Sequence, residues 1–411
     1  MINKIKNILK EQFYPISLYT RKLAGTVVLL LIARYMSVYD YGLFSSYGNI
    51  AGFLFLFANL GFSDWILVSS KTETKEVKLK IALFILNAIV ILLFGLFCSL
   101  FFNIENHIIF MLVTLRVFFD GTFFALIIPY FQAAKKFNTI AMINVIYSIG
   151  VACIAVVSYI LKLSLAKFLF LSIILGFINF IQCTIYIKIS YLTVLFRFKS
   201  FLCYIDKSII DFIMVQLACV LYLQIQPLYV ATYMSKEDAA LYFSANTIAL
   251  LISLFIAALQ QKMLPELIKA KVTEVQSIIK KNIHAIYLGI LLIFLVFVFA
   301  GKFILTTFYG KEYYENGYPI LLLLTLANLF TSTIWIYGTY VTSSGNQRKK
   351  LRMQTEAIFI AVISLFALKQ YGIYGATYSY LITTIYLAVR YYIYTKNLIK
   401  KNLISEGEKY A

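Results

Sequence analysis

Ionisable side chains inside apolar stretches are the residues of this chain most able to do chemistry. Such groups are expensive to place in an apolar setting, so each marks a candidate functional site. Arg116 and Asp120 lie four residues apart in an apolar segment, a spacing that puts both side chains on one face of a helix. The pair is either a self-neutralising ion pair that makes the helix insertable, or a cation for an anionic ligand with an acid that positions it.

Three further acids, Asp64, Asp211 and Glu356, fall within or beside other apolar segments. Desolvation favours the protonated form of a carboxyl group, so these acids and Asp120 are candidates for proton or Na⁺ coupling. For Asp64 and Glu356 the alternative is an interfacial position without a role. Polar residues follow Asp211 in its segment and indicate a face that lines water: Gln216, Gln224 and Gln226.

Arg21 and Lys22 lie about two turns into the first apolar segment. They either line the mouth of a cavity or reach back to lipid headgroups, as long cationic side chains do near helix ends. Arg390, near the end of the last segment, favours the anchoring interpretation. The five cysteines form no CxxC pair and have no histidine nearby, so we expect inert thiols and neither a metal nor a cofactor.

Composition requires lipid as the main solvent of the chain. Of 411 residues 62% are hydrophobic and 13% charged, whereas soluble domains carry about 25% charged residues. Since about 20 apolar residues span a bilayer as a helix, the sequence predicts an all-α integral membrane protein of about twelve transmembrane helices. The segments are about 13–36, 43–69, 81–102, 108–132, 139–161, 168–190, 208–233, 239–264, 284–305, 318–342, 353–370 and 372–395.

The net charge of +19 comes from basic residues in short gaps between the apolar segments. Nucleic-acid binding would need these residues gathered on a folded surface with interleaved aromatics, so no nucleic-acid partner is expected. Most of the 37 Lys and Arg fall in alternate loops. Because cytoplasmic loops are enriched in basic residues, this distribution predicts that both termini are cytoplasmic.

An internal repeat links the two parts of the chain. Residues 33–51 (ARYMSVYDYGLFSSYGNIA) and 231–249 (ATYMSKEDAALYFSANTIA) are identical at nine of nineteen positions at a constant offset. Both copies cover a helix end, an outside loop and the next helix. The repeat predicts two six-helix bundles in parallel orientation, 1–200 and 201–411, which form pseudo-symmetric halves around a central cavity.

Three motifs carry a resemblance to a known family. Residues 33–42 (ARYMSVYDYG) are similar to the A-R-x-L-x-x-x-[DE]-[YF]-G pattern of polysaccharide-unit flippases. Residues 308–313 (FYGKEY), followed by Leu321–Leu324, are similar to an element before the tenth helix of those proteins, and residues 371–376 (YGIYGA) to the start of their last helix. The chain thus resembles the O-antigen and capsule (Wzx-like) flippases of the multidrug/oligosaccharidyl-lipid/polysaccharide exporter superfamily.

This resemblance implies a function, a compartment and partners. The family moves undecaprenyl-pyrophosphate-linked oligosaccharide units from the cytoplasmic to the outer leaflet of the bacterial inner membrane. A cavity for that substrate needs cations to replace water around the phosphates, and Arg21, Lys22 and Arg116 are the candidates. Membrane lipids are expected partners, and a polysaccharide polymerase and a chain-length regulator are candidate protein partners.

Two other functions stay open. A multidrug-type antiporter for small molecules, driven by H⁺ or Na⁺, would share the architecture and the intramembrane acids. A polytopic enzyme of polysaccharide assembly would need acids, bases or metal ligands clustered in a sizeable loop, and the outside loops contain no recognisable constellation. The loop at 70–76 (SKTETKE) lacks the pattern expected of a major-facilitator transporter.

Overall fold

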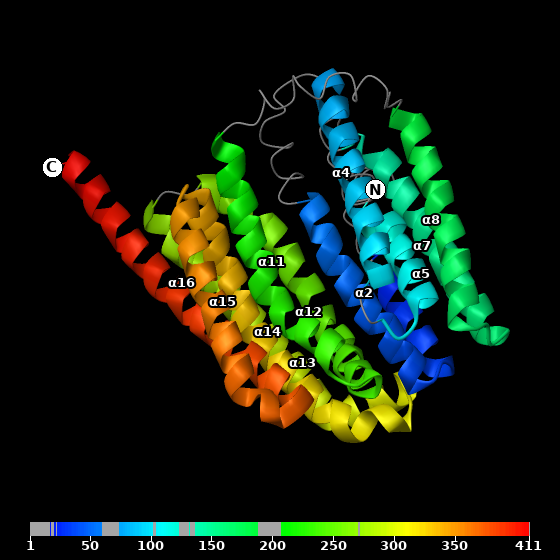
Figure 1. The fold of residues 1–411 in the computed structure, drawn as a ribbon. Coiled ribbons are helices and arrows are strands. Elements are labelled where there is room, and N and C mark those ends of the chain that lie inside the picture. Colours follow the sequence, from blue (N-terminus) through cyan, green and yellow to red (C-terminus); the bar gives the residue numbers. More distant parts are fainter. Residues whose placement is uncertain are drawn as a thin grey trace, which may run out of the picture. The chain divides into compact units, whose positions relative to one another are not determined.

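A computed structural model describes residues 17, 20–21, 23–59, 74–101, 104–122, 131, 136–187, 207–269 and 272–410. Its described elements are helices (Figure 1). In chain order the first of them are Leu23–Tyr35, α2 (Val38–Asn59), α4 (Thr74–Phe101), α5 (His107–Val117), the π-helical turn η1 (Phe118–Thr122), α7 (Phe137–Ile160) and α8 (Leu165–Ile187). They continue with α11 (Lys207–Tyr233), α12 (Lys236–Lys269), α13 (Val272–Phe308), η2 (Lys311–Tyr313), α14 (Tyr314–Ser343), α15 (Gln347–Leu368), η3 (Lys369–Tyr371) and α16 (Gly372–Tyr410).

Each of the twelve predicted segments has a helix at its position, and the all-α membrane fold is confirmed. Seven stretches of the described residues are long and apolar enough to cross a membrane, and Leu23–Tyr35 and Ile85–Phe97 are shorter apolar helices. Two helices run well past their predicted ends: α13 begins at Val272 instead of 284, and α16 reaches Tyr410 instead of 395. Hydropathy detects only the apolar part of a helix, so polar turns that continue it escape detection.

The chain divides into two compact units, Met1–Gln216 and Leu217–Ala411. In the N-terminal unit α2 packs against α4 and α5, and α8 packs against α5, α7 and η1. The apolar core of this unit lies around Phe118 and Phe131, together with Phe55 of α2 and Leu92 of α4. The turn η1 therefore begins at a core residue, which fixes the backbone just before Asp120.

In the C-terminal unit α14 is the central helix and packs against α12, α13 and α16. The helix α15 packs against α16, and their shared core with α14 contains Ile334, Met353, Ala357, Leu387 and Tyr391. A small residue at 357 lets α15 approach its neighbours closely, as small residues do between membrane helices. The hairpin of α15 and α16 is thereby held side by side along its length.

The repeated sequence forms the same helix start in each unit. Ser37 Oγ accepts a hydrogen bond from the Asp40 backbone N–H at 3.1 Å, and Ser235 Oγ accepts one from the Asp238 backbone N–H at 3.0 Å. These bonds cap the first turns of α2 and α12, where helix N–H groups have no partner within the helix. The residues that are identical in the two copies of the repeat thus form the same local structure in both units.

Glycines explain the conformation of the other two motifs. Gly310 between α13 and η2 has φ 121°, and Gly372 at the start of α16 has φ 56°. Side chains with a Cβ rarely adopt such positive φ values, and glycine adopts them readily. At Gly375 a Cβ would collide with the carbonyl oxygen of Leu368. The motif at 371–376 therefore permits the tight turn between α15 and α16.

Candidate functional site

The helix α5 ends in η1, and this junction brings Arg116 and Asp120 together. Arg116 Nε lies 3.1 Å from Asp120 Oδ2, and their side chains are only 13% and 22% exposed. The turn η1 is π-helical, a form that often marks functional positions in helices. The predicted contact at this spacing is therefore present, in a largely buried setting.

Aromatic rings hold the Arg116 guanidinium from two neighbouring helices. Its Cζ atom lies 5.0 Å from the ring centroid of Phe44 on α2 and 5.1 Å from that of Phe168 on α8. Stacking on ring faces suits the planar guanidinium, and an ammonium group would not reproduce it. Among the described residues its two terminal nitrogens have no hydrogen-bond partner, so Asp120 orients the group through Nε and leaves those donors for a ligand.

Arg21 joins the same cluster from the first helix. It donates to Asn144 Oδ1 at 3.3 Å and to the main-chain carbonyl oxygen of Asp120, and its Cζ atom lies 4.9 Å from the Tyr147 ring centroid. The described members of this N-terminal cluster (Arg21, Arg116 and Asp120) are two guanidinium groups and one carboxylate. Such a cluster suits a phosphate or another anion.

The second carboxylate oxygen of Asp120, Oδ1, is buried and has no hydrogen-bond partner among the described residues. An unpaired buried oxygen of this kind is costly. Gly176 of α8 packs against this turn: a Cβ at residue 176 would lie 2.7 Å from the Cβ of Phe119 and 3.5 Å from Asp120 Oδ1. The absence of a side chain at Gly176 therefore sets how closely α8 approaches Asp120.

The close packing of α8 against η1 predicts an effect of Gly176→Ala. The new methyl group would push η1 away from α8 and misalign Asp120 with Arg116 and Arg21, so we expect about a ten-fold loss of transport with normal membrane insertion. Gly150→Ala is the matched control in α7, because the three atoms nearest to a Cβ there all belong to the flexible side chain of Leu175. Complementation of a deletion strain, with expression measured in parallel, checks both variants; equal transport by the two would contradict the positioning role of Gly176.

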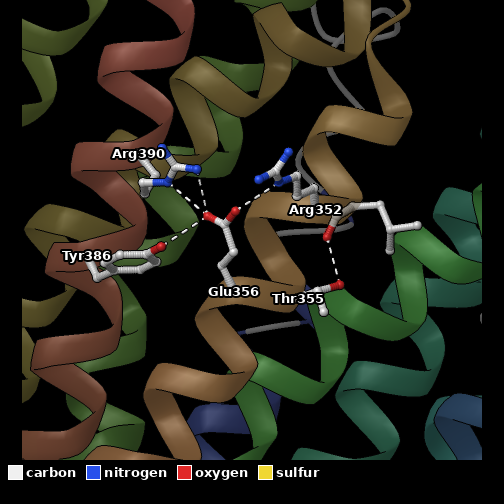
Figure 2. Close-up of polar contacts among 6 residues, drawn as sticks. Arg352, Thr355, Glu356, Tyr386 and Arg390 are labelled. Carbon is white, nitrogen blue, oxygen red and sulfur yellow. Dashed lines mark hydrogen bonds and ion pairs between the residues drawn. The ribbon is translucent and has the colours of Figure 1, made fainter.

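The C-terminal unit contains a second charged cluster around Glu356 (Figure 2). Arg352 Nε lies 3.1 Å from Glu356 Oε1, while Arg390 Nη2 lies 2.8 Å and the Tyr386 hydroxyl 3.0 Å from Oε2. Arg390 Nε also donates to Oε2 at 2.9 Å. Glu356 is thus paired with two cations and a hydroxyl, and Arg390 is an ion-pair partner across the α15–α16 contact.

The structure describes only part of the remaining predicted site residues. Lys22 and Asp64 lie outside the described residues, and Asp211 belongs to α11 but its side chain is outside them too. Gln226, from the polar stripe after Asp211, is buried and donates to Ser379 Oγ at 3.3 Å and Thr383 Oγ1 at 3.4 Å. At Gln226 the polar stripe therefore contacts the neighbouring helix α16.

Sequence reasoning missed the residues that complete each cluster. Asn144, a buried amide in a strongly apolar helix, was a signal that could have been read. Arg352 lies four residues before Glu356, the same spacing that identified the pair of Arg116 and Asp120. No local pattern pointed to Phe44 or Phe168, which are ordinary apolar residues of their helices.

Solved structures share this fold across most of the chain. A structure of the lipid II flippase MurJ in an inward closed conformation is 17% identical with a TM-score of 0.71, covering 93% of this chain and 87% of that chain. An inward-facing multidrug resistance MATE family transporter of the MOP superfamily is 12% identical with a TM-score of 0.69, covering 93% and 95%. The chain thus shares the fold of these multi-pass membrane transporters.

Sequence comparisons identify the family. The capsular polysaccharide biosynthesis protein CapF of Staphylococcus aureus is 26% identical over 151 residues, which cover 35% of this chain and 38% of that relative. The match thus spans well under half the length of CapF. The family described as polysaccharide biosynthesis protein matches residues 12–267, more than half of the chain. The chain therefore belongs to the polysaccharide biosynthesis protein family.

Proposed function

We propose that this protein is a flippase that moves undecaprenyl-pyrophosphate-linked oligosaccharide units from the cytoplasmic to the outer leaflet of the bacterial inner membrane. The observation that carries the proposal is the pair of guanidinium groups in the N-terminal cluster, held among the helices of a polysaccharide biosynthesis family member. The similarity to a lipid II flippase supports a lipid-linked substrate. A pyrophosphate that leaves water needs such cations in its place.

In this proposal Arg116 grips the pyrophosphate with its two terminal nitrogens. Asp120 holds Nε at 3.1 Å, so the free edge of the guanidinium faces the ligand and pairs with two phosphate oxygens. Arg21, fixed by Asn144 and by the Asp120 carbonyl group, adds a second positive charge. Lys22 remains a candidate for the mouth of the same path.

In this proposal, relative movement of the two halves of the chain carries the substrate across the membrane. We infer that the bundles 1–200 and 201–411 rock against each other around a central cavity and expose it to either side in turn. The matching helix starts at Ser37 and Ser235 support two copies of one ancestral unit. We also infer from the distribution of basic residues that both termini lie on the cytoplasmic side.

Ion coupling is best assigned to Asp120 among the described acids. Its Oδ1 atom is buried and has no hydrogen-bond partner among the described residues, so protonation would remove the cost of burying the negative charge and weaken the hold on Arg116. Glu356 has its carboxylate occupied by Arg352, Arg390 and Tyr386, which makes it the weaker candidate. Asp64 and Asp211 stay candidates for coupling, and a polymerase and a chain-length regulator stay candidate protein partners.

A small-molecule antiporter is the second candidate, favoured by the similarity to a multidrug resistance transporter. Deletion of the gene in its host distinguishes the flippase from the antiporter. The flippase proposal predicts that undecaprenyl-linked oligosaccharides accumulate, that surface polysaccharide is lost, and that the wild-type gene restores both; mass spectrometry of the lipid extract then identifies the sugar. Unchanged lipid-linked pools with intact surface polysaccharide would reject the flippase and favour the antiporter.

A further inference from the structure

The cluster around Glu356 has a feature that the proposed transport cycle does not use. Its two arginines lie on the solvent-accessible side of their helices: the Arg352 side chain is 71% and the Arg390 side chain 39% exposed, against 26% for Glu356. Figure 2 shows the two guanidinium groups on either side of the Glu356 carboxylate. We propose that this C-terminal cluster (Arg352, Glu356, Tyr386 and Arg390) binds the phosphate headgroup of an anionic phospholipid.

The Glu356 carboxylate positions the guanidinium groups of Arg352 and Arg390. It accepts from Arg352 through Nε and from Arg390 through Nε and Nη2, so each guanidinium keeps donors that point elsewhere. Both terminal nitrogens of Arg352 have no partner among the described residues. Arg390 meets Glu356 through Nε and Nη2 and also interacts with Tyr386. Two preorganised guanidinium groups, one from each helix, form a clamp that fits phosphate oxygens.

The cluster continues into an exposed apolar surface. The polar contacts set the register of the two helices: Glu356 meets Arg390, and Ser364 Oγ lies 2.8 Å from Ser379 Oγ. Because α15 and α16 run in opposite directions, the exposed residues beyond Glu356 lie alongside one another on this hairpin. They are Phe359, Ile363 and Phe366 of α15 and Ile382 and Ile385 of α16. A charged headgroup site with an adjoining apolar surface fits an amphiphile and not a free phosphate ion.

Charge complementarity selects an anionic lipid. Glu356 is the only acid in residues 347–401, which contain a series of basic residues on the same end of the hairpin: Arg348, Lys349, Lys350, Arg352, Arg390, Lys396, Lys400 and Lys401. Basic residues near a membrane surface attract anionic lipids, and basic sites between membrane helices bind their headgroups. The site belongs to the C-terminal unit, and the proposed substrate cations belong to the N-terminal unit. In this proposal the bound lipid is a phospholipid of the surrounding leaflet, and the experiment below tests undecaprenyl phosphate as the other source.

Native mass spectrometry of the full chain in detergent tests this site with phosphatidylglycerol and phosphatidylcholine as probes. We expect wild-type protein to bind one phosphatidylglycerol about ten-fold more tightly than phosphatidylcholine. Arg352→Gln with Arg390→Gln should abolish this preference. Arg352→Gln alone should reduce it, and because this side chain is highly exposed the single variant keeps its fold.

Lys349→Gln is the matched control, because it removes one exposed positive charge from the same end of α15 without touching the cluster. Lys349 contributes only long-range attraction, so we expect Lys349→Gln to lower the preference much less than Arg352→Gln does. An equal loss in Lys349→Gln and Arg352→Gln would show diffuse attraction and overturn the site, as would an unchanged preference in Arg352→Gln. Displacement of phosphatidylglycerol by a lower concentration of undecaprenyl phosphate would assign the cluster to the substrate lipid and also overturn the proposal. None of these outcomes depends on transport activity.

Discussion

Replacing Arg116 with lysine is expected to leave the protein folded and inserted while lowering export of the lipid-linked unit at least about ten-fold, or about 1.4 kcal/mol. Lysine keeps the positive charge, but its three N–H donors radiate from a single nitrogen. It therefore cannot pair with Asp120 and also present the planar, bidentate pair of donors that a guanidinium offers to a phosphate. It also loses the stacking between Phe44 and Phe168. Surface polysaccharide in a complemented deletion strain measures the effect.

The same assay with Arg116→Ala is expected to show a loss of roughly 30-fold or more, because removing one partner of a buried charge pair costs about 2 kcal/mol or more. Arg348→Lys is the control for an arginine-to-lysine change at an exposed position of α15, and it should export normally. Wild-type export by Arg116→Ala would show that the pair with Asp120 serves only to insert the helix.

The second large effect is expected at Gly375, in the turn between α15 and α16. A methyl group there would run into the carbonyl oxygen of Leu368, a backbone atom that cannot move without shifting α15. We expect Gly375→Ala to destabilise the C-terminal unit by about 3 kcal/mol, at the upper end for an overpacked position. The expected signs are a lower midpoint of thermal unfolding in detergent and a lower yield of inserted protein.

Gly338→Ala in α14 is the control for this substitution. A Cβ at residue 338 would meet the Tyr391 ring at 3.5 Å, an ordinary van der Waals contact, so the unfolding midpoint should change little. A normal midpoint for Gly375→Ala would contradict the close approach of α16 to the end of α15. It would also remove the physical reason for glycine in the motif at 371–376.

The fold was largely predictable from the sequence because lipid imposes simple rules on a chain. Apolar stretches of sufficient length must form helices, and all twelve predicted segments have one. The repeat was also readable, since Ser37 and Ser235 form the same local cap. Helix ends were harder to predict, because the polar first turns of α13 and the last turns of α16 have no apolar signal.

The candidate site was only half predictable. The spacing of Arg116 and Asp120 indicated their contact, but the π-helical form of η1 has no sequence signature. The contact of Arg21 with Asn144 joins residues 123 positions apart, and a periodic pattern carries no information on such pairs. Glu356 was predicted as a coupling candidate or an interfacial acid without a role, and neither prediction named a partner; packing of α15 on α16 brings Arg390 to within 2.8 Å of it. Tertiary packing decided these partners.

Reconstitution into sealed vesicles tests the central claim most directly. The undecaprenyl-pyrophosphate-linked oligosaccharide isolated from the deletion strain is incorporated into both leaflets, and membrane-impermeant periodate then oxidises only the sugars that face outward. Wild-type protein is predicted to make the inner-leaflet sugars accessible to periodate, while Arg116→Lys leaves most of them protected. Folded wild-type protein that leaves the inner-leaflet sugars protected, with or without an ion gradient, would contradict the flippase assignment.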